Sequence, residues 1–556
     1  MKPVAYLWAR VGKCSNPSCN ANVPLLRQFY LSNKKNKKIY LQPIIDGTNI
    51  FFSIQTGICH SERWINRGNL KCPCCNNITT VSDLKVQFNN NEISERLLVK
   101  VISNGAGKEY KLPTSEDLNQ VSSLHQFDHP PQDKMHRNSA GGDTFGWGIN
   151  KWYQLFNKRQ LYFVQYSADK LSKLPINNDA EYSLALKIFL SLWLDRVISY
   201  STSFGRWIPQ NEQLTSLFGR QAIAMIFDYP EMMPFASSTS SALNQLDWII
   251  RYINEESKNS IVANIINASS GDKKQFSKNE ISVTITDPPY YDAIAYADLS
   301  DFFYTWLKVT IGKDLPIVFA TPQTPKKDEC TALKHHRNND SSEAFQHFEE
   351  MLTKIFQAIE YQTEDLISIM FAHQSTLAWT TLCNSILQSD MNINSSWAID
   401  SERDTRMVAN SGNALQSSVT VSCNSIDKAG VGEYKLIKKE IEASIKQEVS
   451  YLYLIGFRGA DLLTACFGKA VSVFGQFESV EKADGSEVKV GELLEMAKEA
   501  AFDAIISDIE TDDLTKFYIG WLNLFGFAEA VHDDVRRISQ IGLSVDISDI
   551  YGQNIL

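Results

Sequence analysis

The sequence lacks the long apolar runs that cross a lipid bilayer. No run reaches the roughly 18 residues that a membrane-spanning helix needs. The first ten residues, Met1–Arg10, also lack the apolar core of a secretory signal peptide. These two absences predict a cytoplasmic protein with no membrane partner.

An excess of positive charge is also missing. The 556 residues include 54 Lys and Arg and 64 Asp and Glu, which gives a net charge of −10. This total argues against a nucleic-acid partner, but the charge is unevenly distributed: residues 1–100 carry +9 and the remainder −19. A basic front segment on an acidic body is typical of a nucleic-acid-binding module joined to another domain. The densest basic run is predicted to contact phosphates, although it could simply solvate the tip of a hairpin: Lys34, Lys35, Lys37 and Lys38.

Cysteine is rare in most of the chain, since six of the ten cysteines fall within the first 75 residues. In a cytoplasmic protein such clustering indicates a metal site rather than disulfides. Two pairs, Cys14-x4-Cys19 and Cys72-x2-Cys75, each lie in a turn-rich stretch. Four thiolates give the closed tetrahedral coordination of a structural zinc site. The spacing therefore predicts a zinc ribbon.

The sequence leaves the exact ligand set of this ribbon open. Cys74 could replace Cys75, and Cys59 with the adjacent His60 offers a rival ligand. A group of reduced cysteines without any metal is the remaining alternative.

The most informative peptide is Asp287-Pro288-Pro289-Tyr290, which follows the β-branched run 281–286. The Asp287 carboxylate and the Pro288 carbonyl can both accept hydrogen bonds from an exocyclic amino group. The two prolines fix the backbone and remove two competing N–H donors. Two acceptors draw the lone pair of an aromatic amine back to its nitrogen, which can then attack an activated methyl group. Tyr290 offers a flat face on which an extruded base can stack.

The position of this peptide in the sequence favours a catalytic role. The alternative is an ordinary proline turn. The peptide is expected at the carboxyl end of a strand, where open α/β sheets bind their ligands. Short apolar or β-branched runs predict strands at 281–286, 366–371, 393–399 and 417–423. Helical patterns predict helices at 242–256, 345–359 and 376–387. The order indicates a doubly wound α/β core whose last two strands could form an antiparallel hairpin.

Changes in composition and in periodic pattern along the sequence predict five regions. These are a basic zinc-ribbon β module at 1–112, a linker at 113–146, a helical and aromatic-rich segment at 147–280 joined to the core, the catalytic part at 281–440, and a mostly helical region at 441–556.

Several segments together resemble the adenine-specific DNA methylases that contain a zinc ribbon. The resemblance rests on Val4–Arg10 with the cysteine pair behind it, on Leu155–Leu161, and on Thr286–Asp292 followed by Tyr296–Phe303. It implies a Rossmann-like methyltransferase sheet and transfer of a methyl group from S-adenosylmethionine to N6 of adenine in DNA. An RNA adenine substrate is the alternative.

One part of the family pattern has no match in this sequence. Such methylases bind S-adenosylmethionine with a loop of the form Asp-Pro-Phe-x-Gly-x-Gly, whose backbone amides approach the cofactor closely. Asn104–Gly107 and Ala140–Gly142 lack the flanking strand and helix, so the cofactor-binding residues are unknown. In similar proteins this loop precedes the zinc ribbon, so the chain looks like the carboxyl portion of such an enzyme, with a partial sheet.

Three interpretations follow. The chain is expected to be one half of a split methyltransferase whose protein partner carries the glycine loop. It could instead be a truncated and inactive gene product, or a zinc-dependent DNA-binding subunit without catalysis.

Overall fold

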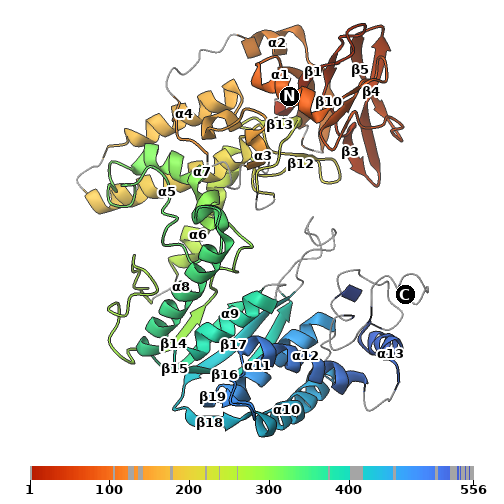
Figure 1. Ribbon diagram of the computed structural model, residues 1–556. Helices are drawn as coiled ribbons and strands as arrows, with labels where there is room; N and C mark the ends of the chain where they lie inside the picture. The colour runs from red at the N-terminus through yellow and green to blue at the C-terminus, as the bar shows by residue number, and fades with distance from the viewer. Residues whose placement is uncertain are drawn as a thin grey trace. The chain divides into compact units, whose positions relative to one another are not determined.

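The computed structural model shows a mixed α/β protein with several separate sheets. Two compact units divide the chain, and Figure 1 labels the elements of each. Unit 1 comprises Met1–Ala263 and Ala295–Glu329, and unit 2 comprises Asn264–Ile294 and Cys330–Leu556. The structure describes residues 3–103, 105, 107–122, 130–135, 142–175, 179–219, 222–236, 238, 240–258, 261–372, 376–400, 417–454, 459–506, 511–525, 535–536, 539, 545 and 550. In these ranges, every helix is too short or too polar to traverse a bilayer.

Unit 1 is built on an antiparallel sheet with the strand order β10-β9-β1-β13. Its strands are β1 (Pro3–Lys13), β9 (Ser94–Ser103), β10 (Lys108–Lys111) and β13 (Asp228–Met232), and β2 (Asn22–Pro24) pairs with the end of β1. Because β13 comes from a much later segment, residues 1–112 do not form a self-contained module. The boundary expected near residue 112 therefore falls inside unit 1.

Two small antiparallel sheets lie in the amino-terminal segment that contains the clustered cysteines and lysines. One contains β3 (Tyr30–Lys34), β4 (Lys37–Asp46) and β5 (Asn49–Thr56), and the other contains β6 (Ile65–Asn66), β7 (Asn69–Lys71) and β8 (Ile78–Thr79). The next segment differs from the expected β structure, because helix α1 occupies Val81–Asn89. Thr80 and Asp83 form a capping box, which satisfies the first backbone N–H groups and starts a helix there.

The remaining elements of unit 1 are mostly helices. They are α2 (Ser115–Ser122), α3 (Gly142–Phe145), η1 (Trp152–Leu155), α4 (Lys158–Ser172), α5 (Ala180–Tyr200), α6 (Ala242–Glu256) and α7 (Tyr296–Ile311), with the short strands β11 (Trp207–Ile208) and β12 (Gln213–Leu214). Helix α7 packs on α4 and α5 and buries Phe302 and Trp306 completely. Unit 1 is therefore completed by a helix that follows the first segment of unit 2.

Parts of the segment expected to be a linker, 113–146, are folded. Helix α2 begins at Ser115, and Lys100 of β9 donates to its Asp117 at 2.7 Å. Thr114 donates to the same carboxylate. The remainder of that segment, 123–129 and 136–141, lies outside the described residues.

Unit 2 contains a mixed α/β core, in the region where the sequence predicted one. Its sheet has the order β14-β15-β17-β16, with β14 (Ile281–Thr286) parallel to β15 (Thr363–Phe371). The strands β16 (Met391–Asp400) and β17 (Ser417–Ser425) pair antiparallel, which confirms the predicted hairpin. The helices α8 (Ser341–Gln362) and α9 (Thr376–Leu387) and the 3-10 helix η2 (Lys334–His336) connect these strands. Apolar residues that recur at helical spacing bury one face of α8 in the core of this unit.

The carboxyl-terminal helices belong to the same hydrophobic core as this sheet. They are α10 (Tyr434–Leu454), α11 (Gly459–Phe474), α12 (Val490–Ile506) and α13 (Asp513–Phe525), and the parallel pair β18 (Ala429–Glu433) and β19 (Phe477–Glu481) accompanies them. Helix α11 packs on β16. Within the region expected to be mostly helical, 441–556, the described residues are mainly helical and belong to unit 2.

Candidate active site and metal centre

The structure places Asp287 directly after the last residue of β14. Pro288 is buried, whereas the Asp287 side chain is exposed. Neither the Asp287 carboxylate nor the Pro288 carbonyl accepts a hydrogen bond from any residue that the structure describes. The two predicted acceptors therefore have no protein partner in these ranges, and the Asp287 side chain is open to solvent.

The backbone turns sharply behind these acceptors. The Tyr291 N–H donates to the Pro289 carbonyl at 3.0 Å, and the Ala293 N–H donates to the Tyr290 carbonyl at 3.0 Å. Tyr291 has φ of 57°, a left-handed conformation that is uncommon for an aromatic residue. Such local strain persists only where surrounding contacts hold it, and it clusters at functional sites.

The two tyrosine rings anchor this turn to the core of unit 2. Tyr290 meets Phe371 of β15 edge to face at 5.7 Å, and Tyr291 meets Phe348 of α8 at 5.3 Å. Burial, followed by the charge of Asp292, raises the pKa of Tyr291. Tyr290 as a whole is partly exposed.

Four cysteines come together in unit 1 as the sequence predicted. The Sγ atoms of Cys14, Cys19, Cys72 and Cys75 all lie within 4.8 Å of one another. The Cys14–Cys75 and Cys19–Cys72 pairs are 3.6 and 3.9 Å apart. A tetrahedron with zinc–sulfur bonds of about 2.3 Å has sulfur–sulfur edges near 3.8 Å. The cluster could therefore bind a metal ion such as zinc.

The same geometry decides among the alternative ligands. Cys59 and Cys74 are both described, and neither contributes a sulfur to the cluster. Burial raises the pKa of Cys14 and Cys72 above that of a free thiol. The backbone N–H of Asn77 lowers the pKa of Cys75 to about 7. A thiolate at Cys75 is accordingly the most readily formed of the three.

The lysine run forms the hairpin tip between β3 and β4. Lys34 and Lys37 do not face solvent alone, because their ammonium groups contact the buried Glu212 carboxylate at 2.5 and 2.6 Å. Burial opposes ionisation of Glu212, but these lysines and the Tyr110 hydroxyl together lower its pKa to about 2. Lys35 and Lys38 are exposed and have no such partner among the described residues. Phosphate contact stays a prediction, and the geometry favours it for Lys35 and Lys38.

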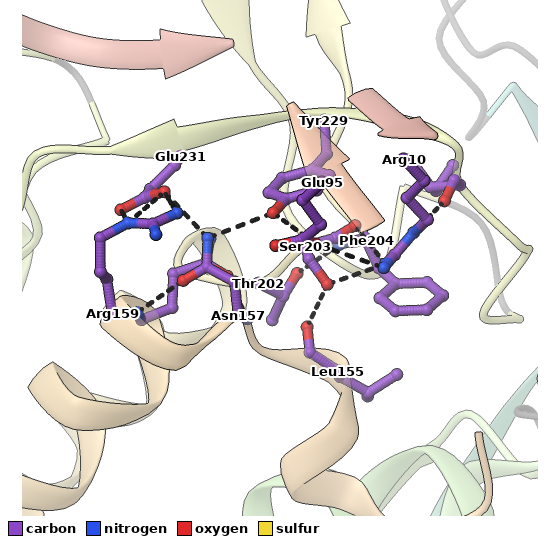
Figure 2. A network of polar contacts seen from close by, with 12 residues as sticks. Arg10, Glu95, Leu155, Asn157, Arg159, Thr202, Ser203, Phe204, Tyr229 and Glu231 are labelled. Atoms are coloured by element: carbon purple, nitrogen blue, oxygen red, sulfur yellow. Dashed lines mark hydrogen bonds and ion pairs between the residues drawn. The ribbon is translucent and has the colours of Figure 1, made fainter. Parts of the chain in front are cut away.

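Sequence reasoning missed a buried polar network in unit 1 that joins β1, β9, β13 and the start of α4 (Figure 2). Glu231 accepts from Arg159 at 2.5 Å and from Asn157 at 2.8 Å. Asn157 also donates to the Tyr229 hydroxyl, which in turn donates to Glu95 at 2.8 Å.

Arg10 completes the network at its other end. Its guanidinium lies 3.5 Å from Glu95, donates to the Ser203 hydroxyl at 3.0 Å, and packs over the ring of Phe204 (Figure 2). Arg10, Asn157 and Arg159 all fall in the segments that carry the family resemblance. That coincidence was the only signal in the sequence that could have pointed to this network.

Comparisons with known proteins give no relative for this chain: no protein-family model, no curated protein and no solved structure matches it.

Proposed function

We propose that this chain is a component of a methyltransferase that modifies N6 of adenine in DNA with S-adenosylmethionine as the donor. The observation that carries the proposal is the position of Asp287-Pro288-Pro289-Tyr290 at the carboxyl end of β14, with two acceptor oxygens that have no partner among the described residues. An aromatic amine needs such acceptors before its nitrogen can act as a nucleophile.

The residues of this chain hold and orient the target base. The adenine is extruded from the duplex, at a cost of a few kcal/mol, and stacks on Tyr290. Asp287 and the Pro288 carbonyl accept its two amino hydrogens. Asp287 need not be a strong base, because the nitrogen becomes acidic once it is methylated and then loses its proton readily. The aspartate favours adenine N6 by family resemblance.

The described residues fit the methyl donor less well than they fit the target base. Gly105 and Gly107 lie between the antiparallel strands β9 and β10 of unit 1, and not after a parallel strand. No side chain or backbone atom comes within 4 Å of the position where a Cβ would stand on either glycine. These glycines therefore do not form a cofactor cradle, and we propose that a partner protein holds most of the donor.

The outer edge of β14 supports the need for a partner. Within the described ranges, no strand pairs with this edge of the sheet. Val283 and Ile285 on this strand are 48% and 81% exposed. A parallel strand is normally buried on both sides, and an unpaired apolar edge is a template for another chain. Added strands from a partner would cover the backbone and apolar side chains that β14 leaves open.

The test is a product analysis of the chain expressed with and without the protein encoded by the neighbouring upstream reading frame. DNA and RNA are incubated with S-adenosylmethionine and digested, and the nucleosides are measured by mass spectrometry. We expect N6-methyladenine only in DNA and only with both proteins. Methylation by the chain alone would remove the partner from the proposal, and methylation of RNA alone would change the substrate.

A second candidate function is a zinc-dependent DNA-binding subunit without catalysis, which the four-cysteine cluster favours. It would be preferred if the two proteins together bound DNA in a zinc-dependent manner but yielded no methylated nucleoside.

A further inference from the structure

The small sheet β3-β4-β5 of unit 1 packs one of its faces on the hydrophobic core. Successive side chains of a strand point to opposite faces of its sheet. Leu41 is buried, and Ile39, Phe52 and Ile54 pack against the same core. Phe52 also contacts Trp64, with 6.0 Å between the ring centroids. These residues define the inner face of the sheet.

The outer face of this sheet carries the alternate residues of β4 and β5. Three cross-strand pairs form it: Tyr40–Gln55, Gln42–Ser53 and Ile44–Phe51. All six residues are exposed or half-buried. The neighbours Ile44 and Phe51 are 50% and 53% exposed. Large apolar side chains that adjoin on a surface and are bordered by polar groups mark an interaction site.

Two aromatic side chains lie on this outer face with polar groups between them. Phe51 pairs with a residue four positions after Tyr40, so the two lie roughly 14 Å apart along the strands. Gln42 and Ser53 occupy the row between them. Tyr40 meets Tyr30 edge to face at 6.2 Å, which limits its movement. Aromatic rings on an open sheet face are the arrangement on which unstacked bases stack.

The charge of this sheet favours an anionic partner. Lys38 precedes Tyr40 by two residues and so shares its face, and Lys35 is exposed in the adjoining hairpin turn. Asp46, at the other end of β4, is the only carboxylate in residues 30–56. The phosphates of a polynucleotide strand can therefore contact the lysines while its bases stack on the rings.

We propose that the outer face of β3-β4-β5 binds single-stranded nucleic acid, with bases on Phe51 and Tyr40 and phosphates at Lys38 and Lys35. The bases of a duplex are stacked on one another and offer no free face to either ring, so a single strand is preferred. The strand is DNA or RNA, since both carry base faces and phosphates. This binding does not rest on methyl transfer at β14.

The decisive variant is Phe51→Ala. Loss of one stacking ring should weaken binding of the strand about five- to a hundredfold. Phe51→Tyr keeps a ring at this position and should bind like the unaltered chain. Phe51 is half-exposed, so neither change should disturb the fold. Phe235→Ala is the matched control, because Phe235 is 74% exposed elsewhere in unit 1.

Lys38→Gln tests the phosphate contact separately. The logarithm of the affinity falls linearly with the logarithm of the salt concentration, and loss of one phosphate contact should make this slope shallower by about 0.7. Lys158→Gln is the control, because Lys158 is an exposed lysine of α4. The slope measured with Lys38→Gln keeps the test decisive if Phe51→Ala does not fold, as judged by circular dichroism.

Fluorescence anisotropy of labelled oligonucleotides with the full chain, without S-adenosylmethionine, measures this binding. The probes are a DNA strand and an RNA strand of about 12 nucleotides, a length that a single-strand site can span, and the DNA duplex of the same sequence. We expect at least one strand to bind more tightly than the duplex, and the tighter of the two strands identifies the kind of nucleic acid. Strand binding that persists when no methyl transfer is detected would leave this inference standing.

Three results would overturn the proposal. Neither strand binds, the duplex binds as tightly as both strands, or the variants that fold bind the strand as the unaltered chain does and with the same salt dependence. If no strand binds and the chain sediments as a dimer that Phe51→Ala dissociates, the outer face is instead a contact between two copies of the chain.

Discussion

At the scale of single residues, the structure assigns different roles to side chains that look equivalent in the sequence. Four lysines form one basic run, yet Lys34 and Lys37 contact the buried carboxylate of Glu212. That carboxylate comes from residue 212, far away in the sequence, so no local pattern could have revealed it. Lys35 and Lys38 keep the exposed positions that a phosphate contact requires.

Glu212 makes the stability of unit 1 depend on pH. Its pKa is about 2 in the folded protein, below the value near 4.5 of a free glutamate. A lowered pKa stabilises the fold above the unfolded pKa, and this stabilisation is lost as pH falls from about 4.5 toward 2. Glu212→Gln should therefore cost about 3 kcal/mol at neutral pH and little near pH 2. Urea unfolding at both pH values measures this, and an equal cost at both would contradict the ion pairs.

The cysteines provide a second prediction at this scale. Metal analysis of the purified chain should find about one zinc, and Cys72→Ser should remove it, because a tetrahedral site needs all four ligands. Cys59→Ser and Cys74→Ser are the controls, since neither sulfur joins the cluster. Zinc retained by Cys72→Ser, or lost from either control, would require a different ligand set.

At the scale of elements, the sequence predicted the helices and strands that are determined by local patterns of residues. The helix at 242–256 and the strand at 281–286 are observed with those bounds, because caps, apolar spacing and β-branched residues are local signals. The approach of Cys14 and Cys19 to Cys72 and Cys75 was predictable from metal-ligand spacing. The pairing of β13 with β1 was not, because two strands more than two hundred residues apart carry no shared local signal.

Substitutions on the exposed edge strand β14 should affect stability much less than substitutions on its buried neighbour β15. Ile285→Ala should change the free energy of unfolding by less than about 0.5 kcal/mol, because its side chain is 81% exposed. Ile369→Ala on the neighbouring strand β15 should cost about 2 to 5 kcal/mol, because that side chain is fully buried.

Ile285→Ala, which should barely change the free energy of unfolding, should have a clear effect on association with a partner. Ile285→Ala is expected to weaken binding of the upstream-encoded protein, as measured by analytical ultracentrifugation of the mixture. Unchanged association would mean that this edge is not the contact.

At the scale of the whole molecule, the chain forms two units whose segments interleave. Helix α7 belongs to unit 1 although residues 264–294 before it belong to unit 2. The sequence offered no signal for this, because α7 follows the Asp287 motif directly and looks like part of the same core. Its membership of unit 1 is decided by Phe302 and Trp306, which are buried with Trp152 and Phe156.

This interleaving predicts how the chain can be divided. A fragment of residues 1–329 retains all of unit 1 and should unfold cooperatively on heating. A fragment of residues 1–263 lacks α7, exposes the apolar residues that pack on it, and should aggregate or unfold without a cooperative transition. Calorimetry of the two fragments compares them directly, and equal cooperativity would show that α7 is dispensable to unit 1.

The central claim is that Asp287 holds the amino group that receives the methyl. The most direct measurement is transfer of labelled methyl to DNA by the chain together with the proposed partner encoded upstream, comparing Asp287→Ala with the unaltered protein. The account predicts that Asp287→Ala abolishes transfer while zinc content and most of the DNA affinity remain, because the exposed carboxylate has no structural partner among the described residues. Undiminished transfer by Asp287→Ala would contradict it.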